Sequence, residues 1–186
     1  MPDTLNGSKW LRAIEHAGHR LASGLSEAEL SAVERHLGVA LPADLRRLLA
    51  IALPCGEGFP DWRQLDDPEL ARQLAWPAEG IAFDVEHNAF WLATWGKRPA
   101  NLEQALAHAH QQVAAAPRLI PLYGHRYLPS APSRAGNPVL SVYQTEIILY
   151  GRDLAAYVEL EFLRASYADA NAGAHGGLPF WGEFLE

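Results

Sequence analysis

The first half of the chain is patterned like a series of amphipathic helices, with apolar residues recurring three and four positions apart. Helices are predicted over residues 10–21, 25–38, 41–52, 66–76 and 100–117. In the second of these, Ser26 is a candidate cap with Glu29 as its capping-box partner, and Gly38 stands where a left-handed stop is expected. Asp67 and Asn101 are the candidate caps of the last two.

The second half carries the two-residue alternation typical of strands. Residues 80–91 place Ile81 and Val85 on one side and Asp84 and Glu86 on the other, which predicts a strand with one wet face. Strands are also predicted over 118–123 and over 138–151, the latter as a hairpin that turns at Gln144 and Thr145. A closing helix is predicted over 153–163, with Asp153 as its cap. The pattern predicts a single-domain α+β fold with N-terminal helices packed on a mainly antiparallel sheet.

Charge narrows the classes of partner. The 186 residues include 22 acidic and 15 basic ones, for a formal net charge of −7, and the basic residues are scattered. Such a surface repels phosphate backbones, so we expect no nucleic-acid partner. The apolar stretches are short and the N-terminus has no signal-peptide pattern, so we expect no membrane association and a cytoplasmic location.

Isolated reactive residues give little support to an enzyme. Cys55 is the single cysteine and has no flanking catalytic pattern, which favours an inert thiol. The pairs His16/His19 and His108/His110 lack the spacing of a zinc-binding helix, so we expect these side chains to be solvent-exposed. No metal and no cofactor are predicted.

The strongest constellation of polar residues joins the predicted strand to the segment "YGHRYLP" at 123–129. Asp84, Glu86 and His87, together with His125 and Arg126, combine carboxylates and imidazoles that are able to do acid–base work or to hold a divalent ion. A metal-dependent hydrolase that uses Asp84, His87 and His125 is therefore one alternative.

The favoured alternative is a structural clamp. Arg126 is expected to form a buried, fork-like bridge to Asp84 or Glu161, with Tyr127 packed around it. His125 is expected to be partly buried and hydrogen-bonded to the same elements. In this hypothesis the turn shapes a contact surface and does not react.

Three longer stretches together resemble bacterial members of the SUKH superfamily. They are "LSEAELSAVERHLGVALPADLRRLLAIALPCGEG", "WPAEGIAFDVEHNAFWLATWGKRP" and "PRLIPLYGHRYLPSAPSRAGNPVLSVYQTEIILYGRDLAAYVELEF". "CGEGFPDW" replaces a G-D-G or G-x-D type of loop found in better-known members. The resemblance divides the chain into an N-terminal helix and linker (1–25), a SUKH-like α+β domain (26–163) and a Gly/Ala-rich, then aromatic tail (164–186). The aromatic residues Phe180, Trp181 and Phe184 are candidates for docking on the body, but Gly176 and Gly177 mark the tail as the segment most expected to be mobile.

The resemblance implies a protein-binding role without a catalytic centre, most often as an immunity protein that neutralises a polymorphic toxin. An acidic immunity protein suits a basic toxin such as a nuclease. A scaffold or regulator with several weaker partners is a second alternative. The candidate partner-binding residues are Trp62, Asp84, Glu86, His87, His125, Arg126 and Tyr127.

Overall fold

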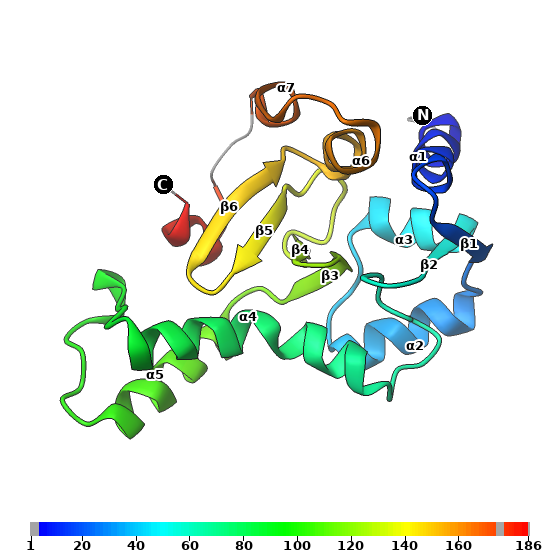
Figure 1. Ribbon diagram of the computed structural model, residues 1–186. Helices are drawn as coiled ribbons and strands as arrows, with labels where there is room; N and C mark the ends of the chain where they lie inside the picture. Colours follow the sequence, from blue (N-terminus) through cyan, green and yellow to red (C-terminus); the bar gives the residue numbers. More distant parts are fainter. Residues whose placement is uncertain (1–3, 174–176, 186) are drawn as a thin grey trace.

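Helices precede a meander of strands in the chain. The computed structural model describes residues 4–173 and 177–185, and side chains from Lys9 onward. Figure 1 shows the elements, which are, in chain order, α1 (Thr4–His16), β1 (Arg20–Ser23), α2 (Glu27–Leu37), α3 (Ala43–Ile51), β2 (Ala52–Cys55), α4 (Pro68–His87), the 3-10 turn η1 (Ala93–Trp95), α5 (Leu102–Ala115), β3 (Leu119–Tyr123), β4 (Arg126–Pro129), β5 (Val139–Tyr143), β6 (Glu146–Gly151), α6 (Leu154–Leu163), α7 (Tyr167–Asn171) and the 3-10 turn η2 (Trp181–Phe184).

The predicted helix caps are confirmed. Ser26 and Glu29 form the capping box of α2, and Gly38 ends that helix with a left-handed φ of 70°. The side chains of Asn101 and Asp153 accept hydrogen bonds from the main chain of the first turns of α5 and α6. These helices begin where they do because a side-chain oxygen replaces the missing partner of an N-terminal N–H group.

Four strands form the main sheet, which is antiparallel and has the order β3-β4-β5-β6. The predicted hairpin is confirmed: β5 and β6 pair from Tyr143↔Glu146 to Val139↔Gly151, and Gln144 takes the positive φ that the tight turn requires. A separate two-stranded ribbon joins β1 to β2. The predicted α+β fold class, with a mainly antiparallel sheet in one domain, is confirmed.

Both faces of the main sheet are covered. α1, α2, α3 and α6 contribute to a first core, and α4, α5 and η2 contribute to a second; in Figure 1, α4 passes along one side of the sheet with α5 beside it. The strands alternate between the two cores. Ile120, Leu122, Leu128 and Val139 face the first, and Leu119, Tyr127, Leu140, Val142 and Ile147 face the second.

The strand predicted over residues 80–91 is wrong, because α4 continues through this segment to His87. Ile81, Asp84 and Val85 are buried at helical spacing, which shows that the alternation was one face of a helix. Gly80 lies against the β5–β6 turn, where an added Cβ would stand 2.8 Å from the Gln144 Cα. This glycine therefore permits a close approach between helix and turn and does not end the helix.

Other local predictions have mixed outcomes. Residues 20–23 form β1 and do not continue the first helix. The aromatic end of the tail docks on the second core: Trp181 is 2% exposed and its Nε1 donates to the Pro117 carbonyl at 2.6 Å. Within the described residues, no helix combines the length and the apolar character needed to cross a membrane.

Candidate functional site

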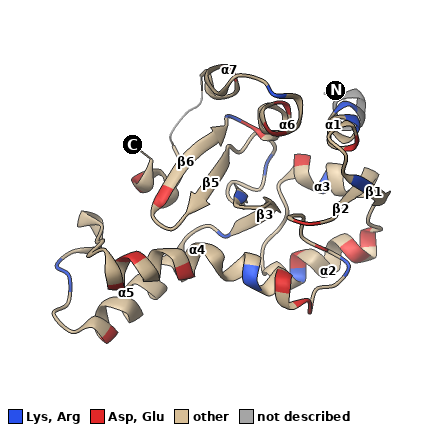
Figure 2. Ribbon diagram, in the orientation of Figure 1, with Lys and Arg blue, Asp and Glu red and all other residues tan. Residues whose placement is uncertain are grey.

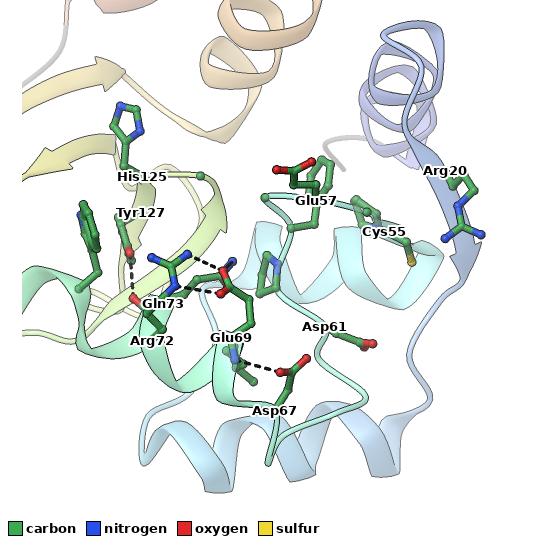
Figure 3. A pocket seen from close by; sticks show the side chains of 18 of the residues that line it. Arg20, Cys55, Glu57, Asp61, Asp67, Glu69, Arg72, Gln73, His125 and Tyr127 are labelled. Carbon is green, nitrogen blue, oxygen red and sulfur yellow. Dashed lines mark hydrogen bonds and ion pairs between the residues drawn. The ribbon is translucent and has the colours of Figure 1, made fainter.

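An open cleft of about 860 Å³ lies beside α4. Three segments form it: the loop that follows β2 (56–61), the first half of α4, and the β3–β4 turn with the end of β5. Figure 3 shows this arrangement, with Arg72 and Glu69 at the centre, Glu57 and Asp61 on the loop, and His125 on the β3–β4 turn. We call this hollow the α4 cleft.

One face of α4 supplies the centre of the cleft. Glu69, Arg72, Gln73 and Trp76 all line it, and their spacing of three, four and seven positions puts them on one side of the helix. The Arg72 guanidinium donates two hydrogen bonds to the Glu69 carboxylate, at 2.9 and 2.6 Å. Its central carbon lies 5.8 Å from the centre of the Trp76 ring. A guanidinium is thus held between a carboxylate and an indole at the surface.

Gln73 and Tyr127 form the buried part of the cleft wall. The Tyr127 hydroxyl donates to the Gln73 main-chain carbonyl at 2.8 Å, and burial raises the pKa of this tyrosine above its ordinary range. The Gln73 side chain is 4% exposed, and its Nε2 lies 3.5 Å from the Glu69 carboxylate. Its Oε1 is buried and has no hydrogen-bond partner among the described residues.

The loop wall of the cleft is fixed to the β3–β4 turn. The Gly124 nitrogen donates to the Gly58 carbonyl at 2.8 Å. A Cβ at Gly58 would stand 2.8 Å from the Tyr123 ring, and this residue also has a φ of +88°, so glycine fits both the space and the conformation. Phe59 then packs on Tyr123 with ring centres 4.6 Å apart. The cleft therefore has a rigid wall opposite α4.

Carboxylates outnumber cationic groups around the cleft. Its lining includes the four acidic residues Glu57, Asp61, Asp67 and Glu69 but two arginines, Arg20 and Arg72. Figure 2 shows acidic positions in the loop after β2, on α2 and along α4. The aromatic side chains of Trp76 and Tyr143 adjoin this charge, with ring centres 6.0 Å apart, and Tyr143 is 54% exposed. An acidic and aromatic surface of this kind favours a cationic ligand.

Arg126 bridges to Glu161, one of its two expected partners, but by a single part-buried contact and not by the expected buried fork, and Tyr127 packs in the second core. The Arg126 Nε lies 3.2 Å from a Glu161 carboxylate oxygen, and the two side chains are 14% and 18% exposed. Its Nη1 donates to the Ser141 hydroxyl at 2.9 Å, and its guanidinium carbon lies 3.7 Å from the centre of the Tyr150 ring. The bridge thus goes to α6, which was one of the two predicted partners, and ties β4 and β5 to that helix.

Asp84 has a different structural role from the one expected on a strand edge. It is 4% exposed and accepts hydrogen bonds from the main chain and hydroxyl of Thr145 and from the Asn88 amide. Burial alone would raise the pKa of Asp84, but the hydrogen bonds from Thr145 and Asn88 outweigh it, so the pKa is lower than usual. Glu86 and His87 are exposed near the end of α4, where His87 stacks on Phe83 with ring centres 4.5 Å apart.

His125 lines the α4 cleft but is exposed, so the prediction of a partly buried, hydrogen-bonded side chain is wrong. The turn presents the ring outward, 6.4 Å from the Tyr143 ring, and anchors itself through the main chain, where the His125 carbonyl accepts from the Val142 nitrogen at 2.9 Å. Partial desolvation and the Arg126 charge lower the pKa of His125, against the opposing charge of Glu161.

Two further expectations about exposed residues are corrected. Trp62 was a candidate contact residue, but it is 3% exposed because it fills the first core. His19 was expected in solvent but is partly buried, with its ring centre 5.1 Å from that of Phe59 and 5.3 Å from that of Tyr123. His108 is likewise partly buried, beside Trp91.

Metal ligation was tested on the side chains that the structure describes. Among them, no group of three or more His, Cys, Asp or Glu side chains lies close enough to hold a metal ion. Both Asp84 oxygens are engaged by Thr145 and Asn88, while His87 stacks in the open at the end of α4. The geometry therefore does not assemble the site that a hydrolase using Asp84, His87 and His125 would need.

Sequence reasoning missed most of the residues that line the α4 cleft. It singled out His125 and Tyr127, but not Glu57, Arg72 or Trp76. One signal was present, since the mixed polar and aromatic face of residues 69–76 has helical spacing. The loop residues gave no comparable signal, because their place depends on the contact between Gly58 and Gly124.

Comparisons with known proteins identified no relative of this chain. No protein-family model, no curated protein and no solved structure matches the chain.

Proposed function

We propose that the chain is a non-catalytic protein-binding domain that acts as an immunity protein and neutralises a toxin domain. The observation that carries this proposal is the α4 cleft, an open hollow of about 860 Å³ in which carboxylates adjoin exposed aromatic rings. The cleft is open, and six of the residues that line it are charged. Aromatic anchors within a polar rim are typical of protein interfaces.

Charge and sequence resemblance support the same role. The net charge of −7 would attract a basic partner and speed its association at low ionic strength. Residues 26–163 resemble the SUKH superfamily, which includes many immunity proteins. The contact surface in this proposal includes His125 and the cleft residues around it, while Tyr127 and Arg126 shape that surface from beneath.

The test uses the purified chain and the toxin domain encoded in the neighbouring reading frame. We expect a 1:1 complex whose association rate falls as salt is added, and loss of the toxin's activity when the complex forms. Tyr143→Ala, in an exposed ring at the cleft, should weaken the complex at least tenfold. Leu163→Ala is the matched control, because Leu163 is also exposed, at 47%, but lies outside the cleft.

Two results would contradict the proposal. One is the absence of any complex with that toxin domain. The other is a set of several weak partners with similar affinities, which would favour the scaffold or regulator alternative. Turnover of a small molecule by the purified chain, abolished by His125→Ala, would support the enzyme alternative instead.

A further inference from the structure

A buried acceptor without a partner lies in the wall of the α4 cleft. Gln73 is 4% exposed, and its Oε1 has no hydrogen-bond partner among the described residues. A buried carbonyl oxygen left in this state destabilises the protein, because it has lost its hydrogen bonds to water and gained none. Gln73 lines the cleft, but its Oε1 is shielded from solvent, so a donor in the cleft reaches this oxygen only when neighbouring side chains move aside.

A guanidinium of the chain itself already occupies the Glu69 carboxylate. Arg72 is held by the Glu69 carboxylate and lies near the Trp76 ring, on the same face of α4 as Gln73. The side chains of Arg72 and Glu69 are 55% and 52% exposed. An ion pair this exposed is weak because water screens both charges, so an external guanidinium is able to compete for Glu69.

The remaining charges favour a cation over any other ligand. When Arg72 is paired with Glu69, the cleft lining still has Glu57, Asp61 and Asp67 against Arg20. An entering cation therefore meets an excess of carboxylates as well as the unpartnered amide oxygen. The side chain that combines several donors with a flat face for an indole is arginine, since an ammonium group has neither the fork nor the face.

We propose that the α4 cleft is an arginine subsite that receives a guanidinium from a basic polypeptide segment of the partner. The incoming group replaces Arg72 on the Glu69 carboxylate, donates to the Gln73 Oε1 and lies against Trp76. Arg72 acts as an internal occupant that moves outward when the partner binds. This inference rests on the proposed function in taking the ligand from a protein, and it adds the chemistry that is recognised.

The first test is a direct binding measurement on the full chain. The probe is a fluorescein-labelled peptide, Gly-Gly-Arg-Gly-Arg-Gly, whose anisotropy is followed during titration. The matched probe replaces both arginines by citrulline, which keeps the shape and removes the charge. We expect saturable binding of the arginine peptide and at least tenfold weaker binding of the citrulline peptide. Equal affinity for the two probes would overturn the proposal.

Variants identify the subsite. Gln73→Met removes the acceptor at similar volume and should weaken the arginine peptide about fivefold. Arg72→Gln removes the internal occupant and should strengthen it about fivefold, while Arg134→Gln makes the same charge change on an exposed loop outside the cleft and should have little effect. Weaker binding by the Arg72→Gln variant would overturn the exchange of guanidinium groups.

The melting curve of Gln73→Met will show whether this variant folds. If it does not fold, a second variant tests the subsite. Glu57→Gln changes an exposed loop residue of the cleft and should weaken the peptide about threefold. Its control is Glu103→Gln, on an exposed part of α5 outside the cleft. Equal effects of these two variants would show that net charge alone attracts the peptide, and would overturn the subsite.

The two proposals fail in different ways. If the toxin domain binds the chain but Gln73→Met and Glu57→Gln leave that complex unchanged, the arginine subsite is wrong and the proposed function stands. If the arginine peptide binds through Gln73 and Glu57 but the toxin domain does not bind, the proposed function is wrong and the subsite remains as a property of the cleft.

Discussion

Asp84 fastens the β5–β6 turn to α4 through Thr145, 61 positions later in the chain. Its carboxylate accepts hydrogen bonds from both the main-chain nitrogen of Thr145, at 2.9 Å, and the Thr145 hydroxyl. The Asn88 amide donates to the other carboxylate oxygen at 2.6 Å. Because Asp84 is almost wholly buried, these donors replace its water, and the residue has a structural role.

Replacing Asp84 by asparagine should destabilise the protein markedly. The side-chain NH2 group of the new asparagine would face a group that donates a hydrogen bond to Asp84 in the parent. At least one of these buried donors would then have no acceptor. We expect the free energy of unfolding to fall by about 2–3 kcal/mol, as measured by urea denaturation at pH 7. The exposed neighbour Glu86 offers the control, since Glu86→Gln should change stability by less than about 0.5 kcal/mol. Equal stability of Asp84→Asn and the parent would rule out this role.

The contribution of Asp84 should depend on pH in a defined direction. Its pKa in the folded protein lies below the usual value of 3.8, so the unfolded chain takes up this proton first as the pH falls. The stabilisation is therefore complete above the unfolded pKa and is lost as the pH falls through the folded pKa. The gap in unfolding free energy between the parent and Asp84→Asn should shrink below about pH 4. A gap that stays constant down to pH 2 would contradict this.

The buried pair Arg126–Glu161 should show strong coupling in a double-mutant cycle. Removing either charge leaves the other poorly solvated, so Arg126→Met and Glu161→Gln should each cost about 3 kcal/mol of unfolding free energy. The double variant should cost clearly less than the sum of the two. Lys9 and Glu159 form a comparable pair on α1 and α6 that is 57% and 39% exposed, so Lys9→Met should cost less than about 1 kcal/mol. Additive costs at the buried pair would refute the clamp.

Gly80 offers a test of the helix-to-turn contact. In an ordinary helix interior, replacing glycine by alanine stabilises by about 1 kcal/mol. At Gly80 the added Cβ would stand 2.8 Å from the main chain of Gln144, so Gly80→Ala should instead lower the melting temperature and cost about 1–3 kcal/mol. Ala107→Gly, on the exposed face of α5, measures the propensity effect alone. A Gly80→Ala variant more stable than the parent would disprove the close contact.

Much of the fold could be predicted where local chemistry decides it. Ser26 with Glu29, Asn101 and Asp153 mark helix starts because each cap is made within a few residues. The fold of residues 80–91 could not be predicted in this way. Pro77 and Gly80 are local signals against a helix, and they are overridden because α4 is buried against both the sheet and the β5–β6 turn.

The candidate site was harder to predict than the fold. Tryptophan is a common anchor residue in protein interfaces, yet Trp62 is buried in the first core. Whether an indole is buried depends on the packing of the whole fold and not on local sequence. Arg126 was expected to bridge to Asp84 or Glu161, and the structure selects Glu161, because Thr145 and Asn88 already engage both oxygens of Asp84. The α4 cleft depends on the contact between the loop at 56–61 and the β3–β4 turn, which lies more than sixty positions later in the chain. No local sequence pattern predicts that contact.

The twenty residues of α4 reach from one core to the other, with Leu70 in the first and Val85 in the second. A helix of that length is a stiff strut about 30 Å long. A ligand that restrains the first turns of α4 is thus expected to restrain the β5–β6 hairpin as well, because Asp84 binds that hairpin to the same helix. Amide hydrogen exchange should reveal it: ligation near Glu69 is expected to slow exchange at Thr145 as well.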